Sequence, residues 1–259
     1  MSQAVPQLKN RFVSFWWGDQ GLSAFLLLLF AAIFLAPFFE SQLLRSFSAI
    51  FLSLLLISGV AYISPRPLLR WATGTVAFTA IILNWLNELQ PSLALDIAGS
   101  AFTLLALITL TLVVLVRAFN DTGSVTLSRV QGAVAAYVLF GISWSILYRL
   151  LDLCLPTAFS ITASAAMTPT EMRESLAYFS FVTLTTLGYG DITAIHPISR
   201  MFVVFEALVG QLYPATLLAR LVSLEISHRQ EWTRTMAQDP DGISPQQQTS
   251  HTTVGGAPK

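Results

Sequence analysis

Charged side chains are scarce in this chain. Its 259 residues include 14 Lys or Arg and 14 Asp or Glu, which is 11% in total, whereas soluble domains carry about 25%. Hydrophobic residues make up 54% of the chain, and the mean hydropathy is +0.65. The chain therefore has too few charged residues to form the polar surface of a soluble domain. The composition excludes a soluble enzyme and a nucleic-acid-binding protein, and it indicates a polytopic, all-α membrane protein that contacts lipid.

Residues that carry covalent or metal chemistry are also few. The single Cys154 cannot form a disulfide within the chain. The three histidines are scattered, and no paired carboxylates occur. A membrane-embedded enzyme would need polar catalytic residues gathered at one membrane depth, and the sequence offers no such cluster. We therefore expect neither enzymatic activity nor an organic cofactor.

Long charge-free stretches predict where the chain crosses the membrane. A bilayer core about 30 Å thick requires about 20 apolar residues per helix. Six helices satisfy this requirement, at 21–39, 47–63, 68–89, 93–118, 130–151 and 197–224. A seventh charge-free stretch, 175–190, is rich in Thr and Gly and poor in aliphatic residues. Irregular backbone at membrane depth is tolerated only inside protein or along a water-filled path, so this stretch predicts a re-entrant loop.

The distribution of Lys and Arg predicts the orientation. With six spans and an internal N-terminus, ten basic residues fall on the cytoplasmic side and four on the outer side, which agrees with the positive-inside rule. Both termini are then cytoplasmic, and the loop enters from outside. The four outer residues are Arg45, Arg149, Arg173 and Arg200.

Four regions follow from this layout. They are an interfacial N-terminus at 1–20, a four-helix peripheral domain at 21–118, a pore domain at 119–227 and a polar tail at 228–259. The tail is too polar to bury a core, and we expect it to be disordered and to hold no soluble ligand-binding domain.

The peripheral domain has no voltage-sensor charges. A voltage sensor needs several Arg or Lys at every third position of one helix. The span at 93–118 has no basic residue before Arg117 at its inner end. Gating by such a sensor is therefore excluded. The linker 120–129 is short enough for packing on the same subunit, although packing on a neighbour remains open.

A helix start precedes the loop. Thr168, Pro169 and Glu171 match an N-cap, a first-position proline and a capping glutamate. This helix can run to about Leu184, a length of roughly 24 Å that is too short to cross the bilayer. Its C-terminus would carry about half a negative charge at the bilayer centre, which favours a cation there.

The residues after this helix can form a cation path. Gly188 and Gly190 allow positive φ, so successive backbone carbonyls can line up as replacements for hydration water. Thr186 adds a hydroxyl, while the side chains of Leu187 and Tyr189 can pack behind the strand. One such strand forms a quarter of a pore, so we expect a homotetramer.

The sequence TLTTLGYGD at 183–191 resembles the selectivity filter of tetrameric potassium channels. The resemblance covers about 130–224 and implies four K⁺ sites formed by the carbonyls of residues 186–189 and the Thr186 hydroxyl. It also implies that Tyr178 and Phe179 form an aromatic cuff that hydrogen-bonds Asp191. The residues assigned to the filter are Thr186, Leu187, Gly188, Tyr189 and Gly190, supported by Thr185. K⁺, the permeant ion, would cross the cytoplasmic membrane of a prokaryote passively.

The last span contains candidates for a gate. Gly210 lies ten residues after Arg200, a separation that many members of this family show between an outer arginine and a hinge glycine. Pro214 removes a backbone hydrogen bond and can bend the helix, while Leu218 and Val222 can form an apolar constriction. Alternatively, Gly210 only allows close helix packing and Pro214 only makes a static kink.

Two further ionisable residues carry competing interpretations. Glu206 is the one charge deep in a span, and intramembrane carboxylates are commonly functional. It either tunes the filter and confers pH sensitivity, or it is a protonated residue satisfied by hydroxyls such as those of Thr183 or Thr185. His196 near the outer mouth is either a second pH sensor or an uninvolved loop residue.

Two classes of function remain in competition. A K⁺ channel is the leading interpretation. The alternative is a K⁺ transporter subunit, or a membrane sensor that keeps a channel-like loop without conducting. Transporters of the related superfamily carry four degenerate single-glycine loops in one chain, whereas this sequence has one loop with both glycines.

Overall fold

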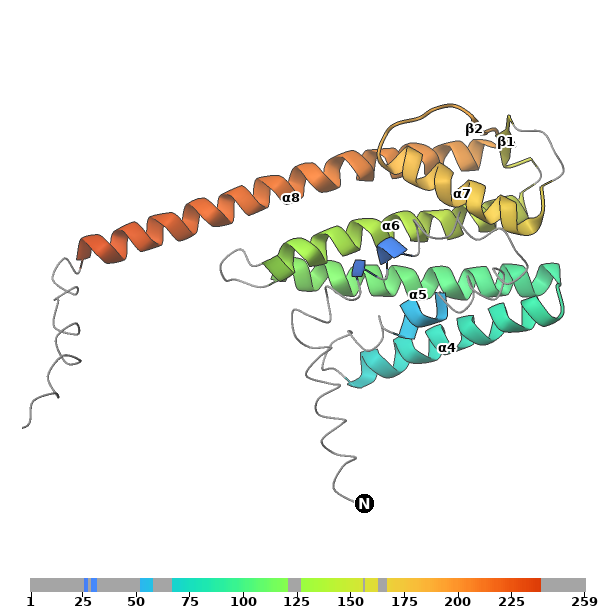
Figure 1. Ribbon diagram of the computed structural model, residues 1–259, viewed down its shortest axis with the longest axis horizontal. Coiled ribbons are helices and arrows are strands. Elements are labelled where there is room, and N and C mark those ends of the chain that lie inside the picture. The colour runs from blue at the N-terminus through green and yellow to red at the C-terminus, as the bar shows by residue number, and fades with distance from the viewer. Residues whose placement is uncertain are drawn as a thin grey trace, which may run out of the picture.

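The computed structural model describes residues 26–27, 29–31, 52–57, 67–120, 127–155, 157–162 and 167–238. Most of the first two predicted spans, all of the region 1–20 and the end of the tail lie outside these ranges. The described part is a bundle of long helices with one small sheet at one end (Figure 1).

Four of the predicted spans correspond to long helices. The elements are α4 (Pro67–Leu89), α5 (Leu93–Asn120), α6 (Leu127–Cys154), β1 (Phe159–Ile161), α7 (Pro169–Leu184), β2 (Ile192–Ala194) and α8 (Pro197–Gln238). Within the described ranges, α5, α6 and α8 contain the stretches long and apolar enough to cross a membrane: Leu93–Val116, Val130–Cys154 and Pro197–Arg220. The chain is therefore a membrane protein. Helix α4 forms where a span is predicted, but its threonines and asparagines lower its hydropathy.

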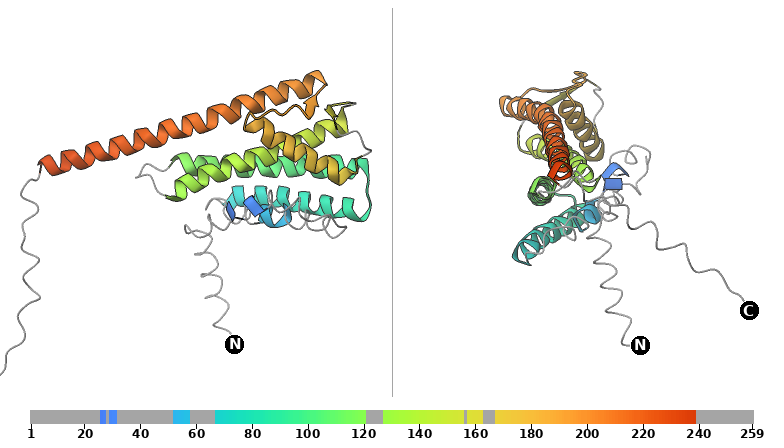
Figure 2. Two further views of the ribbon diagram at one scale, coloured as in Figure 1. Left: turned by 45° about the horizontal axis from the view of Figure 1, so that its top comes forward. Right: turned by 90° about the vertical axis from the view of Figure 1, so that its left-hand side faces the viewer.

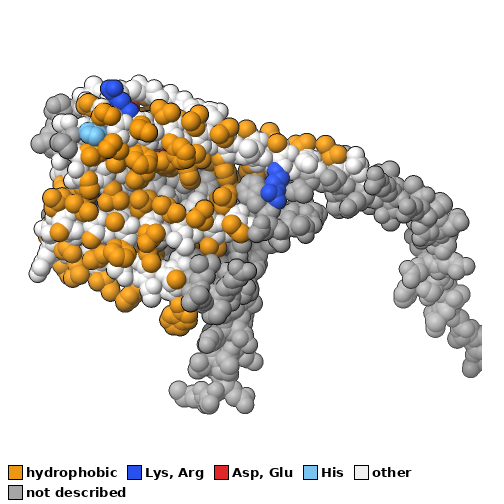
Figure 3. Space-filling model, turned by 180° about the vertical axis from the view of Figure 1, so that it is seen from behind, with side chains coloured by type: hydrophobic (Ala, Val, Ile, Leu, Met, Phe, Trp, Pro, Cys, Tyr) orange, Lys and Arg blue, Asp and Glu red, His pale blue; other side chains and the backbone are white. Residues whose placement is uncertain are grey.

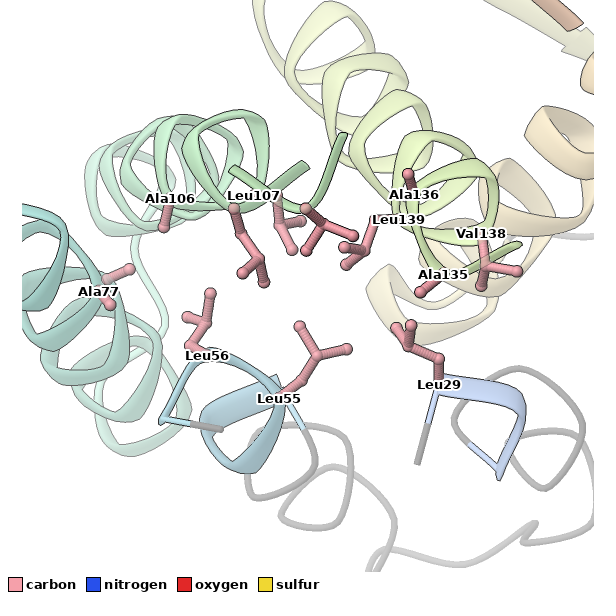
Figure 4. Packing of buried hydrophobic residues seen from close by; sticks show 13 residues of the cluster. Leu29, Leu55, Leu56, Ala77, Ala106, Leu107, Ala135, Ala136, Val138 and Leu139 are labelled. Atoms are coloured by element: carbon pink, nitrogen blue, oxygen red, sulfur yellow. The ribbon is translucent and has the colours of Figure 1, made fainter. Parts of the chain in front are cut away.

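Leucine and alanine side chains hold α4, α5 and α6 together. The three helices lie side by side, with the short described stretches 26–27, 29–31 and 52–57 against them (Figure 2). Alanines on the facing surfaces allow close approach, and leucines fill the remaining space (Figure 4). The residues labelled there are Leu29, Leu55, Leu56, Ala77, Ala106, Leu107, Ala135, Ala136, Val138 and Leu139. Helix α5 packs on both α4 and α6 of the same chain, so it lies in the middle of this bundle.

A second cluster, rich in aromatic residues, joins α6 to α7 and β2. Trp144 and Tyr148 of α6 pack with Leu176 and Phe179 of α7 and with Ile192 of β2. The rings of Tyr148 and Phe179 are 5.3 Å apart, a separation at which aromatic pairs attract beyond simple burial. This cluster fixes the position of α7 on the bundle.

Helix α8 is longer than the predicted span and runs unbroken through Pro214 to Gln238 (Figure 1). The prediction that the tail is disordered from residue 228 is therefore wrong for 228–238, and 239–259 lie outside the described residues. The physical reason is local. No glycine or proline occurs between Pro214 and Pro240, and a proline disfavours helical geometry in the residue before it.

A small sheet was not predicted. Strands β1 and β2 pair antiparallel, with Phe159 opposite Ala194 and Ile161 opposite Ile192. Each strand has three residues, which is too short for an alternating hydrophobic pattern to be recognised in the sequence. The sheet thus connects the segment after α6 to the segment between residue 191 and α8.

Candidate functional site

Helix α7 begins as the sequence predicts. Thr168 is the N-cap, and Pro169 is the first helical residue. The Glu171 backbone N–H donates to the Thr168 hydroxyl at 3.3 Å, and the Thr168 N–H donates to the Glu171 carboxylate at 2.6 Å. The backbone hydrogen bond from Thr168, followed by the bond to its side chain, lowers the pKa of Glu171. This reciprocal pair forms the capping box, and α7 ends at Leu184 as expected.

The chain reverses after α7. The helix starts at the end of the bundle where β1 and β2 lie and stops part-way along α8, and residues 185–191 return to the same end (Figure 1). We call residues 185–191 the returning segment. Its first residues are hydrogen-bonded to the last turn of α7. The N–H groups of Leu187 and Gly188 donate to the Val182 carbonyl at 2.9 and 3.4 Å, and the Thr186 N–H donates to Thr183 at 2.9 Å.

The backbone of the returning segment alternates in conformation. Thr186, Gly188 and Gly190 have φ values of 59°, 55° and 81°. The two glycines therefore take the predicted positive φ. A Cβ at either glycine would meet no atom within 4 Å, so the requirement is conformational rather than steric. The positive φ of Thr186 was not predicted, because a β-branched residue rarely adopts this region.

Hydrogen bonds fix the end of the segment that precedes β2. The Asp191 carbonyl accepts from the Thr162 N–H at 3.0 Å and from the Thr162 hydroxyl at 2.9 Å. The hydrogen bond between Tyr178 and Asp191 that the resemblance implies stays a prediction. Phe179, the other residue assigned to the cuff, instead lies buried against Tyr148.

Gly210 lies against the C-terminal end of α7. A Cβ at this position would be 2.0 Å from the carbonyl oxygen of Leu184. The same oxygen accepts a hydrogen bond from the Tyr137 hydroxyl of α6 at 3.2 Å. Of the two interpretations of Gly210, the close-packing role has direct structural support.

Gln211, which sequence reasoning missed, contacts the segment directly. Its side-chain N–H donates to the Thr186 hydroxyl at 2.7 Å. One indication of this contact is visible in the sequence: Gln211 is a polar residue in an apolar span, where a hydrogen-bond partner is needed. The hydrogen bond joins α8 to the start of the returning segment.

Glu206 is fully buried at the meeting point of three helices. Its carboxyl oxygens lie 2.6 Å from the Ser180 hydroxyl of α7 and 2.5 Å from the Tyr148 hydroxyl of α6. The Ser180 hydroxyl also lies 2.8 Å from the carbonyl oxygen of Gly141. A hydroxyl of α7 is therefore a partner of Glu206, as predicted, but it belongs to Ser180 rather than to Thr183 or Thr185. The Thr185 hydroxyl donates back to the carbonyl of Phe181 in its own helix at 2.6 Å.

The remaining candidates lie on the surface of one protomer. Leu187 and Tyr189 are 59% and 69% exposed, so the chain itself does not supply the packing predicted behind the strand. Leu218 and Val222 are exposed on α8. His196 precedes α8, and its ring Nδ1 accepts from the Ile198 N–H at 3.3 Å. This hydrogen bond lies at the start of α8, and both interpretations of His196 stay predictions.

An ion-pair network, also missed, ties the peripheral helices to α7. Asp96 of α5 accepts from Arg149 of α6 at 2.7 Å and from Arg173 of α7 at 3.0 Å. Arg173 also lies 3.8 Å from Glu88 of α4. Four helices are thereby linked at the end of the bundle where α7 begins.

Comparisons with known proteins agree with this geometry. A family model described as "Ion channel" (Ion_trans_2) matches residues 150–226, which include α7, the returning segment and most of α8. Within the matched residues lie Thr186, Gly188 and Gly190, whose backbone alternation is described above.

Two curated relatives share part of this region. Protein LctB of Geobacillus stearothermophilus is 40% identical over 60 residues, which cover 23% of this chain and 44% of the relative. Protein LctB of Bacillus caldotenax is 31% identical over 87 residues, which cover 33% of this chain and 64% of the relative. The chain thus spans less than two thirds of either relative. No solved structure matches it.

Proposed function

We propose that four copies of this chain form a passive K⁺-selective channel in the cytoplasmic membrane of a prokaryote. The observation that carries the proposal is the positive φ at every second position of the returning segment, at Thr186, Gly188 and Gly190. In the proposed assembly, each copy contributes one such strand to a central pore, and both termini face the cytoplasm.

The alternating backbone provides the coordination chemistry. A strand that alternates between left-handed and ordinary φ turns its successive carbonyl oxygens toward one side. Rings of such oxygens replace the water around a K⁺ ion as it enters. In this proposal, the carbonyls of residues 186–189 and the Thr186 hydroxyl form the K⁺ sites, and ions in neighbouring sites repel each other, which speeds exit.

The orientation of α7 supports a cation rather than an anion. The helix ends at Leu184, immediately before the first proposed ion ligand. A helix C-terminus carries about half a negative charge, and its effect is largest in the last turn. Four such ends around one axis favour a positive ion at the inner end of the strands and repel an anion.

The surface of a single protomer supports the assembly. Residues 185–191 are all exposed in one copy, and lipid cannot hydrogen-bond an irregular backbone. Helix α8 beside them exposes large apolar side chains, including Leu208, Leu212 and Leu218. One face of the molecule is covered mainly by hydrophobic side chains, with basic groups near its ends (Figure 3). Other copies of the chain would bury the segment, and four strands complete each ring of oxygens.

A K⁺ transporter subunit and a non-conducting sensor remain the competing proposals. Both could keep a loop of this kind. The presence of both glycines at positive φ, in a chain with one such loop, favours a symmetrical conducting pore. The absence of a charge ladder in α5 argues against a conventional voltage sensor, and no chemical step needs to accompany ion passage.

The proposal can be tested in liposomes that contain the full-length protein under a K⁺ or a Na⁺ gradient. We expect rapid K⁺ flux and much slower Na⁺ flux. Gly188→Ala should abolish this difference, because alanine resists positive φ by about 1–2 kcal/mol.

Gly99→Ala is the matched control for this variant. A Cβ at Gly99 of α5 would make ordinary contacts, at 3.5 Å and beyond, with Asn84, so selectivity should be unchanged. Equal flux of both ions in the wild type, or unchanged selectivity in Gly188→Ala, would contradict the proposed filter. Undetectable flux in correctly assembled protein would favour the non-conducting alternative.

A further inference from the structure

We propose that Gln211 is the positioning residue of the innermost K⁺ site and holds the Thr186 hydroxyl in the orientation that binds the ion. This inference rests on the proposed function, because it names the residue that shapes one of its sites. It starts from Thr186, whose φ of 59° is unusual for a β-branched residue. Such a conformation persists only where the surroundings hold it.

Two hydrogen bonds from different helices hold Thr186. Its backbone N–H donates to the Thr183 carbonyl of α7 at 2.9 Å. Its hydroxyl accepts from the Gln211 side chain of α8 at 2.7 Å. The first bond fixes the backbone where the segment leaves α7. The second fixes the side chain, and it is made by the helix that would line the pore.

The direction of the second bond matters for ion binding. A threonine hydroxyl has one proton and two lone pairs, and an amide N–H can only donate. Gln211 therefore occupies one lone pair and leaves the other available to a cation. Without this donor, the hydroxyl can rotate and present its proton to the ion position. The Gln211 amide thus keeps the Thr186 oxygen in its accepting state.

The position of Gln211 on α8 agrees with this role. Gln211, Leu218 and Val222 are separated by seven and four residues and share one helix face, and all three are exposed in a single copy. The neighbouring face carries Glu206 and Gly210, which are buried against α6 and α7. In the proposed tetramer, the first face lines the pore. Four Gln211 amides then form a ring immediately inside the filter.

A double-mutant cycle in the full-length, liposome-reconstituted protein tests the inference. Gln211→Met keeps the length of the side chain and removes the donor, while Thr186→Val removes the acceptor. We expect Gln211→Met to lower the ratio of K⁺ to Na⁺ flux by a factor of about five, the typical net effect of one hydrogen bond. In a Thr186→Val background, Gln211→Met should cause little further change.

Thr216→Val is the matched control for this cycle. Thr216 is also an exposed polar residue of α8, but its hydroxyl bonds to its own helix, at the Leu212 carbonyl 2.8 Å away. Its substitution should leave the flux ratio unchanged. Recovery of the assembled protein by size-exclusion chromatography identifies variants that fail to assemble. If Gln211→Met fails to assemble, Gln211→Glu replaces it. Glutamate keeps the shape of the side chain but can only accept from the Thr186 hydroxyl, so it should also lower the ratio of K⁺ to Na⁺ flux.

The outcomes separate the two proposals. A selective wild type with an unchanged ratio in Gln211→Met overturns the role of Gln211 and leaves the channel function standing. Additive effects of Gln211→Met and Thr186→Val also overturn the role, because they indicate independent sites. A wild type that does not distinguish K⁺ from Na⁺ overturns the channel function, and the inference falls with it.

Discussion

Gly210 of α8 approaches the carbonyl oxygen of Leu184 so closely that a Cβ at position 210 would lie 2.0 Å from that oxygen. Leu184 is the last residue of α7, and its backbone cannot move without moving the segment that follows. This contact sets the distance between the helix that ends below the proposed filter and the helix that would line the pore.

Gly210→Ala should therefore destabilise the protein rather than only change its gating. Overpacking of a well-packed contact typically costs about 1–3 kcal/mol, and here the obstacle is backbone. Thermal unfolding in detergent should show a lower midpoint for Gly210→Ala than for the wild type, and Gly99→Ala should match the wild type. If Gly210→Ala melts normally and alters only the open probability, the hinge interpretation gains support over the packing one.

Glu206→Gln and Glu206→Leu should differ strongly in stability. The glutamine can accept from the Tyr148 hydroxyl and donate to the Ser180 hydroxyl, which in turn can donate to Gly141. The leucine leaves the buried Tyr148 and Ser180 hydroxyls without this partner, at a cost of about 1–3 kcal/mol. Thermal unfolding of both variants measures the difference. Equal midpoints would show that hydrogen bonds from residue 206 to Tyr148 and Ser180 do not stabilise the packing of the three helices.

The same Glu206→Gln variant tests the pH hypothesis. Single-channel recordings of wild type and variant between pH 5 and 8 should diverge if Glu206 tunes the filter. Identical gating at every pH would discard the tuning hypothesis. Tyr148 and Tyr137 of α6 are the titratable neighbours of Glu206 among the residues that the structure describes.

Asp96→Asn should destabilise the protein more than Glu88→Gln. The pair of Asp96 and Arg149 is largely buried, with side-chain exposures of 14% and 7%. Removing one partner of a buried ion pair costs about 3 kcal/mol or more, whereas partly exposed pairs contribute about 0–1 kcal/mol. Glu88 lies 3.8 Å from Arg173 and both are partly exposed, so Glu88→Gln is a matched control. Comparable unfolding midpoints for the two variants would contradict a central role for Asp96.

The capping box of α7 should weaken in acid. Because hydrogen bonds from Thr168 lower the pKa of Glu171 below that of an ordinary glutamate, the folded state favours the ionised carboxylate. Its contribution is fully present above the ordinary glutamate pKa and is lost as the pH falls through the lower folded-state value. Unfolding midpoints measured from about pH 6 down to about pH 3 should therefore converge between wild type and Glu171→Gln. A constant difference over this range would show that the ionised form is not what caps the helix.

Local patterns in the sequence predicted the local features of this site well. The start of α7 follows from Thr168, Pro169 and Glu171, which lie within four residues of each other. The positive φ of Gly188 and Gly190 follows from the conformational freedom of glycine. The long helices α5, α6 and α8 follow from charge-free stretches of sufficient length.

Contacts between distant residues could not be predicted in the same way. Glu206 meets Ser180 and Tyr148 from two other helices, and their relative rotation depends on packing that one sequence does not specify. The amide of Gln211 and the ion pairs of Asp96 are set by the same tertiary packing. A four-residue periodicity identifies the face on which Glu206 lies, but it does not identify the partner on that face.

The exposed segment at 185–191 has a consequence for genetics. If the ion path exists only where four strands meet, one subunit with an altered strand is enough to impair the selectivity of the whole complex, provided that this subunit folds and assembles. Co-expression of Gly188→Ala with the wild type should then lower the ratio of K⁺ to Na⁺ flux well below that of the wild type, because few complexes would contain only intact copies. A defect in this short stretch is therefore expected to be dominant, whereas a defect that prevents folding of the chain should be recessive.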